Sequence, residues 1–168
     1  MDTRRIVILG LFTAIAGVLH AVEAWLPLPL PVPGAKLGLA NIISLVTIHM
    51  YGWQAALTVA GLRVFLGSLL AGAFLGPAFI MGLSGALASS LAMAGVYQFG
   101  RKAFSLLGIS LIGAVAHNLA QITAAALLVA SFGVVWYLPY LLLFALPTGL
   151  ITGLVAHFFL TRMSRIAN

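Results

Sequence analysis

Arg63 is the residue whose type could most directly do chemistry, because it lies near the middle of the apolar segment 53–70. An arginine at such a position costs about 2.5–3.5 kcal/mol on insertion scales, so it should face the protein interior and have a partner. Glu23, the one acidic residue besides Asp2, is a possible structural ion-pair partner, although it could equally neutralise Lys36. The alternative is that Arg63 binds an anionic group of a ligand. The sequence leaves both interpretations open.

A second group of polar residues interrupts the apolar segment 104–130, where His117, Asn118 and Gln121 follow one another closely. His117 and Gln121 are four residues apart and share a helical face. Polar side chains in an apolar helix need hydrogen-bond partners, and these are either a ligand or a neighbouring helix. Ser84 falls at similar depth on the preceding segment. We therefore expect these residues and Arg63 to converge on one cavity in the outer half of the protein.

The segment 36–51 predicts a short helix that begins with glycine and Lys36 near the outer surface. The free N–H groups and the positive dipole end of such a helix favour an anion, and Lys36 adds a positive charge. Asn41 is expected about one turn deeper. The alternative for Lys36 is an interfacial anchor whose ammonium group reaches water.

The connection before this helix alternates proline with apolar residues. Its prolines and the following glycine are Pro27, Pro29, Pro31, Pro33 and Gly34. Proline at every second position blocks a helix and favours an extended, stiff strap. This strap is either a lid over the outer end of a cavity or a connector that rests on the membrane interface.

The composition excludes a soluble domain. Of the 168 residues, 63% are apolar and 6% are charged, and the mean hydropathy is +1.20. An average soluble domain has roughly 25% charged residues, so this chain lacks the side chains for a polar surface. There is no cysteine, and carboxylates are nearly absent, so a metal site is not expected. The net charge of +6 comes from basic residues that lie mainly at segment ends, where they indicate membrane topology rather than a nucleic-acid partner. The chain is predicted to be an all-α integral membrane protein in the lipid bilayer.

The apolar segments predict one compact domain, residues 1–168, made of six transmembrane helices. Their expected bounds are 6–26, 36–51, 53–70, 74–99, 104–130 and 135–161. Each is read as a membrane helix because only helices and closed barrels satisfy their backbone groups in lipid, and no alternating strand pattern is present.

The basic residues predict the orientation of the helices. Arg4 and Arg5 precede the first segment, Arg101 and Lys102 separate the fourth from the fifth, and two arginines follow the sixth. With six spans these clusters fall on one side, which the positive-inside rule identifies as cytoplasmic. Both termini are therefore expected inside.

Two strings and one residue carry a resemblance to a known family. The strings are PGAKLGLANI at 33–42 and GAVAHNLAQ at 113–121, with Arg63 between them. Together they resemble the Gx transporter family, which is also labelled heptaprenyl diphosphate synthase component I. That family in turn is similar to the substrate-binding S components of energy-coupling-factor (ECF) vitamin transporters.

The resemblance implies a six-helix S-component-like fold in a bacterial-type cytoplasmic membrane. It implies a pocket near the outer face that the proline-rich loop gates. It also implies a transmembrane coupling subunit with two cytoplasmic ATPases, contacted through Gly10, Ala14 and Gly17. The chain would then be the substrate-binding subunit of an importer for a small, anionic or vitamin-like solute, with no catalytic residues and no cofactor.

The synthase label suggests a different function. Prenyl chain elongation needs paired aspartate-rich motifs that hold magnesium and diphosphate, and this chain has one aspartate and one glutamate. An enzyme is therefore not expected. A membrane accessory component of heptaprenyl diphosphate or quinone synthesis, and a stand-alone channel or carrier, remain alternatives.

Overall fold

A computed structural model describes residues 2–26, 38–100 and 102–167, and this part of the chain is helical with no strand. The helices are α1 (Thr3–Trp25), α2 (Asn41–Tyr51), α3 (Trp53–Leu70), α4 (Pro77–Phe99), α5 (Leu106–Val129), the short 3-10 helix η1 (Phe132–Tyr137) and α6 (Leu138–Ala167). The all-α prediction is confirmed for the described residues.

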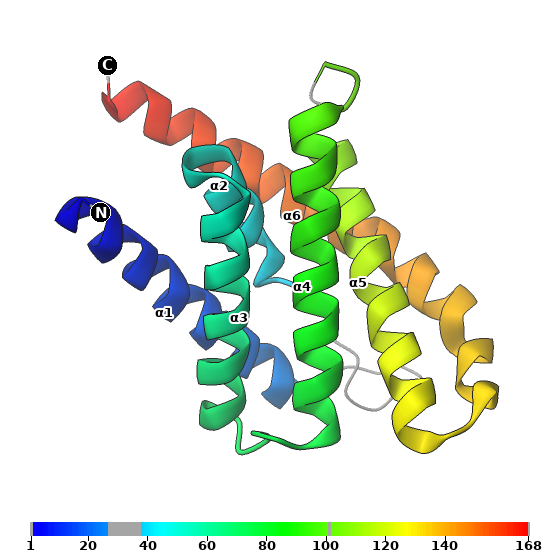
Figure 1. The fold of residues 1–168 in the computed structure, drawn as a ribbon. Helices are drawn as coiled ribbons and strands as arrows, with labels where there is room; N and C mark the ends of the chain where they lie inside the picture. Colours follow the sequence, from blue (N-terminus) through cyan, green and yellow to red (C-terminus); the bar gives the residue numbers. More distant parts are fainter. Residues whose placement is uncertain (1, 27–37, 101, 168) are drawn as a thin grey trace.

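The helices form a bundle in which α3 and α4 run antiparallel and α5 packs between α4 and α6 (Figure 1). α1 packs mainly on α3, and the short α2 lies behind α3. Both chain termini lie at the end of the bundle that also holds the connection between α4 and α5 (Figure 1). The basic residues around Arg4, Lys102 and Arg162 therefore gather at one end, as the sequence predicts.

The expected and observed helix bounds differ by three residues or fewer except at the start of α2 and at the end of α6, which continues to Ala167 instead of ending at 161. The segment 53–70 is reproduced as α3, whereas α2 begins at Asn41 rather than at Lys36. The cause is a turn at Gly38, which has φ +83° and whose carbonyl accepts a hydrogen bond from Asn41 N at 2.8 Å. A residue with left-handed backbone cannot continue a right-handed helix, so the helix begins only after Gly38. Asn41 therefore lies in the first turn of α2 instead of one turn inside the helix.

Five helices of the described residues are long and apolar enough to cross a membrane: α1, α3, α4, α5 and the continuous run of η1 and α6. α2 has 11 residues, which is about 16 Å at 1.5 Å per residue and too short for a core of roughly 30 Å. Figure 1 shows its first turn about midway along α3. A topology of six complete spans thus stays a prediction.

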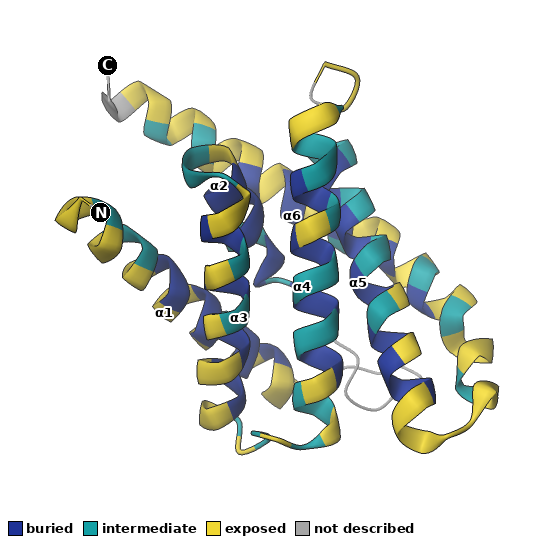
Figure 2. Cartoon of the chain, viewed as in Figure 1, coloured by how far each residue is buried: buried dark blue, intermediate teal, exposed yellow. Residues whose placement is uncertain are grey.

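Burial follows the expected pattern of a bundle in lipid, with exposed residues on the outward faces and buried residues between the helices (Figure 2). Glycines permit the closest of these contacts. A Cβ on Gly153 of α6 would lie 2.9 Å from Leu107 Cα, and one on Gly149 would lie 3.0 Å from Leu111 Cα. The α5–α6 contact therefore depends on bare backbone at these two positions, as small residues commonly provide in membranes.

We expect Gly153→Ala to push α6 away from α5, because the added methyl group would meet backbone rather than a movable side chain. Overpacking of this kind lowers the free energy of unfolding by about 1–3 kcal/mol. Thermal unfolding in mild detergent measures the loss. Gly61→Ala is the matched control, because a Cβ there has nothing within 4 Å, and equal stability of the two variants would contradict the packing.

Candidate functional site

The start of α2 and the turn that precedes it are held inside the bundle by two oppositely charged side chains. Arg63 of α3 donates from Nη2 to Asn41 Oδ1 at 2.7 Å, and Glu23 Oε1 of α1 accepts from Leu39 N at 2.7 Å. The exposed fractions are 1% for Arg63, 4% for Glu23 and 6% for Asn41. The charge of Glu23 also acts on the Arg63 guanidinium. Three predicted site residues from three helices therefore meet at this turn.

Gly38 makes the arrangement possible. Its φ of +83° is a conformation that residues with a Cβ rarely adopt, and an added Cβ would lie 2.9 Å from Asn41 Nδ2. The side chain of Asn41 thus folds back over the turn while its oxygen faces Arg63. A short helix that starts at mid-depth, instead of at the surface, is what places this amide beside the arginine.

Arg63 is not fully used by these contacts. Its Nε is buried and has no hydrogen-bond partner among the described residues. A guanidinium offers five N–H donors in a fixed plane, which suits carboxylate and phosphate groups. The site thus keeps a buried cationic N–H donor to which an anionic ligand could bind.

Two histidines fill notches that glycines leave on α4. The ring of His20 on α1 is 3.3 Å from where a Cβ of Gly82 would be, and the ring of His117 on α5 is 2.9 Å from that of Gly85. Gly82 and Gly85 are three residues apart and face the same way along α4. Both rings are buried, so α4 presents bare backbone where α1 and α5 bring polar groups inward.

Gln121 shares the second notch and is the least satisfied polar side chain there. A Cβ on Gly85 would lie 3.0 Å from its Cγ, and its exposed fraction is 1%. Neither its Oε1 nor its Nε2 has a hydrogen-bond partner in the described part of the chain. Burying an amide without hydrogen-bond partners costs about 1–3 kcal/mol, as judged from mutations in proteins. This side chain therefore favours a ligand that has both a donor and an acceptor.

Two further predicted residues make contacts between helices. Asn118 Nδ2 donates to Leu141 O of α6 at 2.7 Å. Ser84 Oγ donates to Met81 O of its own helix at 2.9 Å and lies 3.4 Å from Ala120 O of α5. These bonds correspond to the helix–helix interpretation of the cluster, and a ligand role for Asn118 and Ser84 stays a prediction.

Other predicted positions lie outside the buried cluster, by which we mean Glu23, Asn41, Arg63, His117 and Gln121. The lid residues Pro27, Pro29, Pro31, Pro33 and Gly34, and the cation Lys36, lie outside the described residues. On α1, Gly10 and Ala14 are exposed. Gly17 is instead buried, and a Cβ there would lie 3.4 Å from Leu66 Cβ on α3. The contact of these small residues with a coupling subunit, which the resemblance implies, stays a prediction.

Sequence reasoning did not single out several buried polar residues. The hydroxyls of Ser44, Ser89 and Ser90 are fully buried and have no hydrogen-bond partner among the described residues. Serine is common in membrane helices, where its hydroxyl usually bonds to its own backbone, so its type alone gives no signal. The glycines at 67, 82 and 85 are a better signal, because they mark where His20 and His117 must fit. No group of three possible metal ligands lies together within the described ranges.

A model of the family described as heptaprenyl diphosphate synthase component I matches residues 12–159. The chain belongs to this family. The match includes α2 to α5 complete, and so every residue of the buried cluster. No curated protein matches the chain.

The fold of this family member is similar to a solved structure described as the S component of a bacterial ECF transporter. The two chains are 18% identical, the TM-score is 0.79, and the similarity covers 100% of this chain and 99% of the other. At this identity the likeness shows the fold alone, and it confirms the expected S-component-like architecture.

We expect Gly38→Ala to lower the free energy of unfolding more than Gly72→Ala does, because Gly72 has φ +68° but open space around it. Both variants have the cost of left-handed backbone, about 1–2 kcal/mol. Only Gly38→Ala also crowds Asn41 and disturbs its bond to Arg63. Thermal unfolding of both variants in detergent measures the difference, and equal losses would show that the turn is not coupled to the cluster.

Proposed function

We propose that this protein is the substrate-binding membrane subunit of an ECF-type importer and takes up a small solute with an anionic group. The observation that carries the proposal is the buried cluster itself. Arg63 keeps an unpartnered Nε, and Gln121 keeps both amide atoms unpartnered among the described residues. Unpartnered polar groups in an apolar interior cost free energy, so they favour a ligand that completes their hydrogen bonds.

The fold supports the same function. The likeness to an S component extends over the full length of both chains. The chain also has too few carboxylates to bind magnesium and diphosphate as a prenyl-transferring enzyme would. We therefore propose a non-enzymatic role, in which Arg63 and Asn41 bind the anionic end of the solute and Gln121 and His117 contact the rest. Ser84, Asn118, Lys36 and Glu23 are proposed to complete the pocket.

The proposed topology follows from the basic residues. The cations at the end with both termini would face the cytoplasm, which places the chain in a cytoplasmic membrane with N-in and C-in orientation. The opposite end would face outward, where the loop 27–37 is proposed to act as the lid. The exposed small residues Gly10 and Ala14 would then contact a coupling subunit that carries cytoplasmic ATPases.

A second function is favoured by one observation, the family description itself. A component of heptaprenyl diphosphate synthesis would bind a separate prenyl-transferring protein and would need no ATPase. In that case Arg63 and Gln121 would bind the headgroup of a lipid-like diphosphate rather than a soluble solute.

We expect the purified protein to retain a small anionic compound from a cell or growth-medium extract, as identified by mass spectrometry. Arg63→Ala should lower the retained amount about 30-fold or more, because a buried charge contact is worth about 2–5 kcal/mol. Gln121→Leu keeps the volume and should weaken retention without unfolding the bundle. Arg162→Ala, on the exposed end of α6, is the matched control and should retain the compound as the wild type does.

Folding of each variant is checked by thermal unfolding. A folded Arg63→Ala protein with unchanged retention would contradict the ligand role. If Arg63→Ala does not fold, Gln121→Leu decides, and unchanged retention there would contradict the pocket.

We expect Ala14→Leu to reduce co-purification of a coupling protein and its ATPases with the tagged chain from a native membrane. The bulky side chain would separate two closely packed helices, since small residues allow such approach. Gly61→Leu adds a larger side chain to an open surface of α3 and should change nothing. Recovery of a prenyl-transferring enzyme in place of ATPases would favour the second function.

A further inference from the structure

A cavity of about 770 Å³ lies at the end of the bundle that holds both termini. Its wall includes Gly52 and Trp53 at the corner between α2 and α3, Tyr97 and Gln98 in the last turn of α4, and Lys102 in the following loop. Tyr97 is 12 residues beyond Gly85, which is about 18 Å along the helix. The cavity is therefore separate from the buried cluster.

The aromatic side chains of Trp53, Tyr97 and Phe99 line part of the cavity. Tyr97 Oη and His49 Nδ1 lie 3.1 Å apart, and the two rings meet edge to face with their centroids 5.7 Å apart. These contacts hold the Tyr97 side chain in its position in the cavity wall. Trp53 and Phe99 are 47% and 87% exposed at the rim. Tryptophan and tyrosine at helix ends are typical of the level of lipid headgroups.

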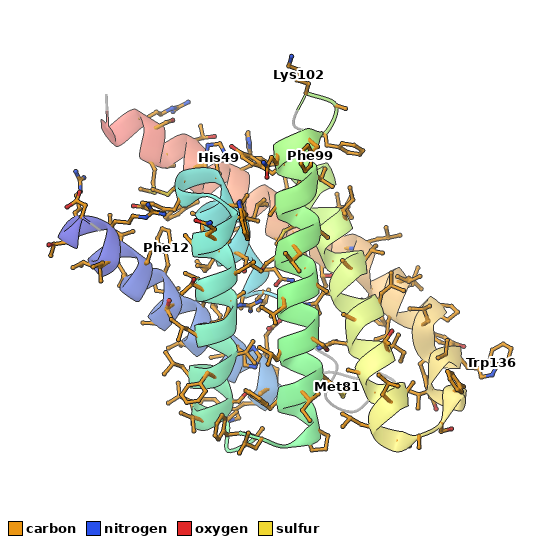
Figure 3. All side chains as sticks on the ribbon, in the orientation of Figure 1. Phe12, His49, Met81, Phe99, Lys102 and Trp136 are labelled. Atoms are coloured by element: carbon orange, nitrogen blue, oxygen red, sulfur yellow. The ribbon has the colours of Figure 1, made fainter. Side chains whose placement is uncertain are left out.

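Positive charge surrounds the same end of the bundle. Lys102 stands at the tip of the loop after α4 and points away from the helices (Figure 3). Arg5 donates to Tyr51 O at 3.3 Å, one residue before Gly52 in the cavity wall. The acidic Asp2 at this end accepts a hydrogen bond from Arg4 N as a helix cap. The described cations here exceed the described anions, so the cavity mouth attracts a negative group.

An apolar stripe leads from the cavity along α4. Gln98 in the cavity wall shares its helical face with Leu91, seven residues earlier, and with Ile80, eighteen residues earlier. Leu91 and Ile80 are 53% and 43% exposed. A molecule with a charged end at Lys102 and an apolar chain of more than about 20 Å would fit this face.

We propose that this cavity binds the headgroup of an anionic phospholipid, with an acyl chain along the α4 stripe. The phosphate lies at the mouth beside Lys102, and the glycerol part lies against Trp53 and Tyr97. Basic pockets between helices on the cytoplasmic side of membrane proteins are known to bind such headgroups. The site is separate from the buried cluster, and it rests on the proposed topology that places this end of the bundle at the cytoplasmic face.

The test uses the full chain in mild detergent with added phosphatidylglycerol or phosphatidylcholine, and native mass spectrometry counts the lipid molecules bound. The wild type should keep phosphatidylglycerol in preference to phosphatidylcholine. Lys102→Glu should lower bound phosphatidylglycerol about fivefold or more. Arg165→Glu makes the same charge change at the same end, on an exposed residue outside the cavity wall, and should leave binding near the wild-type level.

Ala103→Trp provides a second variant, because it fills the cavity while keeping Lys102. It should also lose phosphatidylglycerol. Equal losses in Lys102→Glu and Arg165→Glu would overturn the proposal, since binding would then follow net charge alone. Retention in Ala103→Trp, or displacement of the lipid by inorganic phosphate at millimolar concentration, would overturn it as well.

Discussion

A buried arginine in a membrane protein must have partners, and Arg63 has its partner at a helix that starts in the middle of the bundle. The bond from Arg63 to Asn41 and the bond from Leu39 N to Glu23 hold the first turn of α2 between α1 and α3. Charges of opposite sign on the two sides reduce the cost of bringing each out of water. The start of the short α2 and the left-handed backbone at Gly38 both belong to this arrangement.

The same region combines rigid packing with unsatisfied polar groups. Glycines on α4 let His20 and His117 approach its backbone, and Gln121 is buried beside them. Packing this close leaves little freedom for the side chains to turn and find other partners. The Gln121 amide has no hydrogen-bond partner among the described residues. Because the packing already holds this side chain in place before binding, it favours a ligand of matching shape and polarity.

Much of the fold could be predicted from the sequence because hydropathy determines which segments can be membrane helices. α3 was predicted to the residue, and Arg63 was identified from its type alone. The start of α2 was not predicted, because a single left-handed glycine decides it and glycine is common throughout the chain. Asn118 and Gln121 had equal standing in the sequence, and they differ only because Leu141 O lies within reach of Asn118. Hydrogen-bond partners on other helices depend on how the helices pack, and the hydrophobic periodicity of the sequence does not determine that packing.

The most direct test of the central claim is an experimental structure of the protein purified with the small molecule that it retains. We expect an anionic group of that molecule within about 3 Å of the Arg63 guanidinium, and a donor and an acceptor at the same distance from the Gln121 amide. A molecule bound elsewhere, with Arg63 and Gln121 satisfied entirely by protein groups, would show that the buried cluster is structural and would contradict the account.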